Sequence, residues 1–119
     1  MHPFPPTEDL PNLVGDEIIQ IWLDPHAVRF LFGAGVQLYV EEAYELTEPG
    51  GTPWTYDFGE AGPVFLLQRH LYQPIVTLKR EDFRLTLSME DGAKLAIVSN
   101  RGQYECGHFQ WPDGKIQVF

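Results

Sequence analysis

The fold is decided by the stretch from Val14 to Glu42, VGDEIIQIWLDPHAVRFLFGAGVQLYVEE, because the chain returns to the same pattern from Leu71 onward. Residues 71–99, LYQPIVTLKREDFRLTLSMEDGAKLAIVS, align with it without a gap. Apolar residues coincide at 11 of the 29 aligned positions, where random placement would give about eight. A true duplication and the alternation common to any two β-hairpins both explain this excess. Either way, the sequence predicts two similar β units, over 14–42 and 71–99.

Within each unit, a period of two predicts strands joined by tight turns. Val28, Phe30 and Phe32 alternate with Arg29 and Leu31, as in a strand with one well-buried face. The aligned segment 83–89 alternates in the same way, and the Asp-Gly pair that follows it favours a hairpin turn. Together with two short strands near the C-terminus, the pattern predicts at least seven strands, mainly antiparallel.

The rest of the chain is assigned around these two units. Residues 1–12 are rich in proline and predict an irregular N-terminal arm, whereas residues 43–63 predict an acidic, aromatic loop with a short extended piece at 54–58. After Pro63, an apolar run predicts one short helix near 64–71. We therefore expect one mainly β domain over 1–119, in which the two meander units form an antiparallel curved sheet or a barrel-like sandwich.

The composition narrows the class of protein. A chain of 119 residues, 44% of them hydrophobic, is long enough to bury one core without a metal, a disulfide or a cofactor. The single Cys106 excludes an internal disulfide and fits a reducing cytoplasm. The first residues lack the basic and apolar regions of a signal peptide, and no stretch approaches the roughly 20 apolar residues of a membrane span. We expect a cytoplasmic protein that does not enter a membrane.

The net charge of −9 is concentrated in one part of the chain. Residues 1–68 hold 11 acidic side chains and a single basic one, Arg29, whereas the rest of the chain is close to neutral. An acidic field repels phosphate backbones, which argues against binding to nucleic acid. The same field attracts a basic protein partner and speeds the encounter with it.

The acidic segment between the two units is the candidate partner-binding site. It combines carboxylates with aromatic residues, and protein interfaces are enriched in tyrosine and tryptophan. An alternative is that the aromatic residues fix the segment to the core while the carboxylates stay in water. The candidate partner-binding residues are Glu41, Glu42, Tyr44, Glu45, Glu48, Trp54, Tyr56 and Asp57.

A weaker candidate site lies near the C-terminus, at Tyr104, Glu105, Cys106 and His108. A Cys-x-His pair supplies two zinc ligands, but a structural zinc site needs four and the chain has no second cysteine. In a strand, Cys106 and His108 would share a face, as a thiol and its activating base must. The alternative is that Cys106 is a buried structural residue of a strand. We expect no catalytic residue and no metal or cofactor.

The order of these motifs resembles a family of small, functionally uncharacterised bacterial proteins rich in β structure. The motifs that carry the resemblance are Leu13-Val14-Gly15 leading to Ile18, Phe32 and Gly35 leading to 36–41, the hairpin over 83–95, Tyr104-Glu105, and the final strand over 114–118. The resemblance implies a single β-rich domain with no assigned activity. Small acidic bacterial proteins of this kind include immunity proteins that neutralise toxins, which is an analogy and not a shared motif.

Three functional hypotheses follow from the sequence. The first is a non-enzymatic protein-binding domain, in the form of an immunity-like inhibitor of a basic partner. The second is a small-molecule-binding domain or a small enzyme with a pocket near residues 104–108. The third is a homodimer in which strand edges pair.

Overall fold

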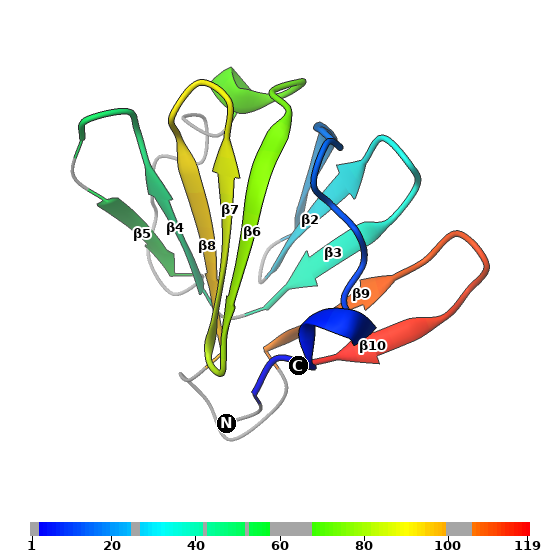
Figure 1. Ribbon diagram of the computed structural model, residues 1–119. Coiled ribbons are helices and arrows are strands. Elements are labelled where there is room, and N and C mark those ends of the chain that lie inside the picture. Colours follow the sequence, from blue (N-terminus) through cyan, green and yellow to red (C-terminus); the bar gives the residue numbers. More distant parts are fainter. Residues whose placement is uncertain (1–2, 25–26, 42, 52, 58–67, 100–105) are drawn as a thin grey trace.

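The computed structural model describes residues 3–24, 27–41, 43–51, 53–57, 68–99 and 106–119 (Figure 1). In these residues, ten strands form two open antiparallel sheets, so the expected mainly β fold is confirmed. The first sheet has the order β1 (Ile18–Asp24), β2 (Ala27–Phe32), β3 (Gln37–Val40), β9 (Gly107–Gln110), β10 (Ile116–Val118). The second sheet has the order β6 (Ile75–Glu81), β7 (Arg84–Met89), β8 (Lys94–Val98), β4 (Ala43–Thr47), β5 (Pro53–Asp57).

The two units predicted from the sequence contain the same three strands. In the alignment of the two units, β1, β2 and β3 fall on β6, β7 and β8, so that Ile18 corresponds to Ile75 and Gln37 to Lys94. The cross-strand pairs correspond as well: Phe30 lies opposite Leu38 in the first unit, and Leu87 lies opposite Leu95 in the second. The first strand of each unit is also irregular at the same place, directly after its first residue. The sequence echo is therefore a structural repeat with a common register.

The hairpin that follows each meander joins the sheet of the other unit. β4 follows β3 in the chain but pairs with β8, whereas β9, which is next after β8, pairs with β3. These hairpins also correspond to each other: Leu46 lies opposite Leu95, and Phe109 lies opposite Leu38. Figure 1 shows the result, with β4 and β5 beside β8, and β9 and β10 beside β3. The hairpin that follows each unit thus completes the sheet of the other unit.

The two units meet in a reciprocal contact ahead of their first strands. The amide of Gly15 donates to the carbonyl of Ile75 at 2.7 Å, and the amide of Tyr72 donates to the carbonyl of Ile18 at 2.9 Å. Gly15 and Tyr72 are corresponding residues, and both have a positive φ, of 89° and 66°. Such a φ suits glycine but strains tyrosine. The repeat thus requires at position 72 a backbone conformation that tyrosine adopts only at a cost.

One hydrophobic core is shared by both sheets. It contains the inward-facing side chains of both meanders, which the period of two predicted, and it also takes in both exchanged hairpins. The ring of Phe30 in β2 contacts the ring of Tyr44 in β4 edge-on, with centroids 5.7 Å apart. Burial of this shared surface is what holds the two sheets together.

The N-terminal arm is irregular apart from a short 3-10 turn, η1 (Thr7–Asp9), but it is tied to β6 and to the C-terminal residue. Phe4 is buried and stacks on Phe119 with ring centroids 4.5 Å apart. The guanidinium of Arg80 donates to the carbonyl of Phe4 at 2.6 Å and to that of Pro5 at 3.0 Å. The arm therefore closes the core beside the C-terminus.

One expectation about the middle of the chain needs correction, and a second falls largely outside the described residues. The acidic, aromatic loop expected over 43–63 instead contains the strands β4 and β5 as far as Asp57, because the exchanged hairpin has an open edge of the second sheet to pair with. Residues 58–67 lie outside the described part. Of the helix expected near 64–71, the described portion is a single 3-10 turn at 68–70. Among the described residues, no helix has the length and apolar character needed to cross a bilayer.

Candidate functional site

A row of aromatic and cationic side chains crosses the outer face of the first sheet. The register places Trp22 opposite Arg29, Arg29 opposite Tyr39, and Tyr39 opposite His108. All four side chains are half-buried, whereas their neighbours Phe30 and Leu38 point into the core. These four residues, called here the aromatic row, lie on four adjacent strands.

The aromatic row is held together by ring contacts. The guanidinium carbon of Arg29 lies 5.5 Å from the ring centroid of Trp22 and 5.2 Å from that of Tyr39. The rings of Tyr39 and His108 have centroids 5.1 Å apart and are tilted by 36°. A cation within about 6 Å of an aromatic face is attracted by the ring, by about 0.5–1 kcal/mol at an exposed site. These ring contacts therefore fix the four side chains relative to one another before anything binds to them.

Apolar residues extend this surface to the edge of the sheet. Val118 in β10 lies opposite His108, and Ile116 lies opposite Gln110 in the adjacent row. Both are unusually exposed for apolar residues of their size: Val118 is 44% exposed and Ile116 is 55% exposed. The aromatic row thus continues without a charged interruption to the free edge of β10.

The second sheet carries different residues at the corresponding positions. There, Lys79, Thr86, Ala96 and Glu45 replace Trp22, Arg29, Tyr39 and His108. Since both sheets have the same register and the same kind of buried face, the fold itself does not require aromatic side chains on the outside. The aromatic row is therefore specific to the first sheet and is not explained by the fold that the two sheets share.

Two exposed carboxylates flank the aromatic row at one end of the first sheet. Asp24 follows Trp22 at the second position along the chain, and Glu41 follows Tyr39 in the same way. Because β1 and β3 run in the same direction on either side of β2, both carboxylates lie at the same end of the sheet. The surface therefore combines aromatic anchors with negative charge.

The candidate partner-binding residues predicted from the sequence do not share one surface. Glu41 is exposed, but Tyr44 is buried and belongs to the core. Glu45, next to Tyr44 on β4, points to the opposite face and pairs with the guanidinium of Arg84. Trp54, Tyr56 and Asp57 belong to β5, but their side chains and all of Glu42 lie outside what the structure describes.

Glu48, the remaining candidate, belongs to a hydrogen-bonded cluster around the buried His70. The His70 side chain is 5% exposed; its Nε2 lies 2.8 Å from Glu48 Oε2 and its Nδ1 lies 2.5 Å from Asp91 Oδ2. The cluster joins the turns after β4 and β7 to the 3-10 turn at 68–70. In the other half of the repeat, Leu13 takes the place of His70. The role of Glu48 in this structure is to bind His70.

The second candidate site is divided in a similar way. Cys106 is fully buried, whereas His108 lies half-buried in the aromatic row. Tyr104 and Glu105 fall outside the described residues. Within the described part of the chain, no three His, Cys, Asp or Glu side chains are grouped as a metal site would need.

Comparison with protein-family models, with curated proteins and with solved structures finds no match for this chain. The resemblance to a family of small bacterial β-rich proteins therefore stays a prediction.

The sequence does contain a signal for the aromatic row, at positions where the two units differ. In the alignment of the two units, Trp22 stands against Lys79, Arg29 against Thr86, and Leu31 against Ser88. These mismatches all fall on outward positions of the strands. Where two copies of a unit share their inner residues, the outer positions that differ are the ones free to acquire function.

Proposed function

We propose that this protein is a non-enzymatic binding domain for a basic partner protein, and that the outer face of the first sheet is the contact surface. The observation that carries the proposal is the aromatic row, Trp22, Arg29, Tyr39 and His108, on the first sheet. The corresponding positions of the second sheet hold no aromatic residue. Tryptophan, tyrosine and arginine are the residues that most often contribute a large share of binding energy in protein interfaces.

The charge of the chain supports a basic partner. A net charge of −9 favours the approach of a positive surface and speeds association at low salt. Asp24 and Glu41 place exposed carboxylates beside the aromatic row. Glu45 and Glu48, in contrast, already bind Arg84 and His70 within the protein, so the proposed contact surface does not include them. Inhibition of a basic toxin, as by an immunity protein, is one form of such binding.

The proposal is tested by affinity capture with a matched pair of variants. The test variant is Trp22→Ala with Tyr39→Ala, and the control is Lys79→Ala with Thr86→Ala on the outer face of the second sheet. If each aromatic residue contributes about 2 kcal/mol, losing one weakens binding about 30-fold. We expect the test variant to lose the basic protein that the wild type and the control retain.

The captured protein is then purified and titrated by calorimetry at low and high salt. The proposal expects an affinity that falls as salt increases, and a further loss when Glu41 is changed to Lys. Equal capture by both double variants, or an affinity that does not depend on salt, would overturn it. A protein that captures only further copies of itself would instead support the homodimer hypothesis.

A further inference from the structure

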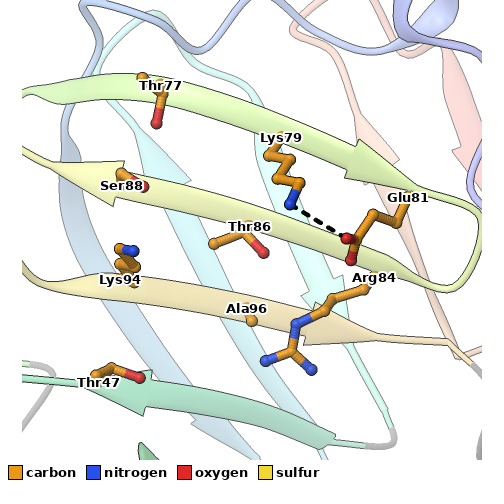
Figure 2. A pocket seen from close by; sticks show the side chains of 9 residues that line it. All are labelled: Thr47, Thr77, Lys79, Glu81, Arg84, Thr86, Ser88, Lys94 and Ala96. Atoms are coloured by element: carbon orange, nitrogen blue, oxygen red, sulfur yellow. Dashed lines mark ion pairs between the residues drawn. The ribbon is translucent and has the colours of Figure 1, made fainter.

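The outer face of the second sheet forms a polar groove that the proposed function does not use. Strands β6, β7, β8 and β4 line it, and Figure 2 shows the lining side chains. The lining residues are Thr47, Thr77, Lys79, Glu81, Arg84, Thr86, Ser88, Lys94 and Ala96. Hydroxyl and cationic groups thus predominate in a chain whose overall charge is strongly negative.

One end of the groove is neutralised by internal ion pairs. Lys79 Nζ lies 3.3 Å from a carboxylate oxygen of Glu81, and the Arg84 guanidinium pairs with Glu45. In Figure 2, Lys79, Glu81 and Arg84 lie together toward the same end of the strands. This end offers an incoming anion little net positive charge.

The other end has donors without carboxylates. The register places Thr77 opposite Ser88, Ser88 opposite Lys94, and Lys94 opposite Thr47, which gives one cross-strand row of three hydroxyls and one ammonium group. Among the described residues, no carboxylate lies within ion-pair distance of Lys94. The corresponding row of the first sheet contains glutamine and leucine and no cation. As with the aromatic row, the repeat shows that this chemistry is not required by the fold.

We infer that this row binds a tetrahedral oxyanion, a phosphate group, at Lys94 between Ser88 and Thr47. Directly opposed residues in an antiparallel sheet have Cβ atoms about 4.5–5.5 Å apart, so the three side chains can reach one anion together. The ammonium group and both hydroxyls can donate to its oxygens, and hydrogen bonds from a charged donor are the stronger kind. Because the protein as a whole repels anions, binding depends on these local donors.

The experiment is an NMR titration of the isotope-labelled protein at constant ionic strength. Inorganic phosphate is one probe and glucose 6-phosphate is the other, which separates a site for the free anion from a site for a phosphorylated small molecule. We expect saturable shifts at the amides of Thr47, Ser88 and Lys94, with a dissociation constant below about 10 mM for at least one probe.

Two lysine variants decide the origin of any shifts. Lys94→Met is expected to weaken binding at least tenfold, whereas Lys115→Met, which removes a cation stacked on Trp111 in the turn between β9 and β10, should leave it unchanged. Shifts that stay linear over the titration, or saturable binding that Lys94→Met does not weaken, would overturn the inference. The groove and the aromatic row lie on different sheets, so failure of one leaves the other untouched.

Discussion

Gly107 is where the exchange of hairpins can be tested most sharply. A Cβ added to this residue would lie 2.1 Å from the carbonyl oxygen of Tyr39 and 2.8 Å from Cζ of Phe119. A carbon and a carbonyl oxygen need about 3.3 Å, so β9 would have to move from β3 by about 1 Å. Gly107→Ala therefore disturbs the ladder that attaches the second hairpin to the first sheet.

The expected cost combines overpacking with lost hydrogen bonds. Overpacking costs about 1–3 kcal/mol, and weakening about two ladder hydrogen bonds adds about 1–3 kcal/mol. Gly107→Ala should therefore lower the free energy of unfolding by about 4 kcal/mol, a large part of the roughly 5–15 kcal/mol typical of a domain.

Urea unfolding followed by tryptophan fluorescence measures this change. Gly51→Ala is the matched control, because its Cβ would meet only Glu48, at an ordinary contact distance of 3.4 Å. The control should stay within about 0.5 kcal/mol of the wild type. A Gly107→Ala protein that also stays within about 1 kcal/mol would refute the pairing of β9 with β3.

Three further substitutions test other parts of the account. His70→Leu removes the two hydrogen bonds from the ring to Glu48 Oε2 and Asp91 Oδ2, so we expect a loss of about 2 kcal/mol in urea unfolding; an unchanged midpoint would show that the cluster contributes nothing. Tyr72→Gly relieves a positive φ and should raise the melting temperature, since the strain is about 1 kcal/mol, whereas a fall would mean that the contacts of the ring outweigh it. Arg29→Thr, which copies the residue at position 86, should cost no more than about 2 kcal/mol of stability through its two ring contacts while weakening partner capture; unfolding of this variant would show that the aromatic row is structural.

The sequence was sufficient to predict the repeated meander but not the way the two copies combine. Alternation tells which face of a strand is buried, so residues such as Phe30 and Leu87 could be assigned to the core. It does not tell which strand lies alongside. The correspondence between the hairpins β4–β5 and β9–β10 cannot be found in the ungapped alignment, because their separation along the chain is larger than that of the two meanders. Their residues also differ in kind, since Tyr44 corresponds to Gly107.

The fold separates the described candidate residues for a related reason. Sequence proximity grouped Tyr44, Glu45 and Glu48, but in a strand adjacent side chains point to opposite faces, and the partners of both glutamates come from distant parts of the chain. The residues of the aromatic row, in contrast, are brought together by the fold. They are far apart in the sequence, and Tyr39 and His108 meet only because the hairpin is exchanged.

Crosslinking from two corresponding positions on the two sheets tests whether the first sheet is the contact surface. A photo-crosslinking amino acid is placed at Leu31, on the outer face of the first sheet, or at Ser88, which occupies the same position on the second. Both variants are expressed in cells, irradiated and resolved by mass spectrometry. We expect a crosslink to a basic protein from position 31 and none from position 88. A crosslink to that protein from position 88, with none from position 31, would contradict this expectation.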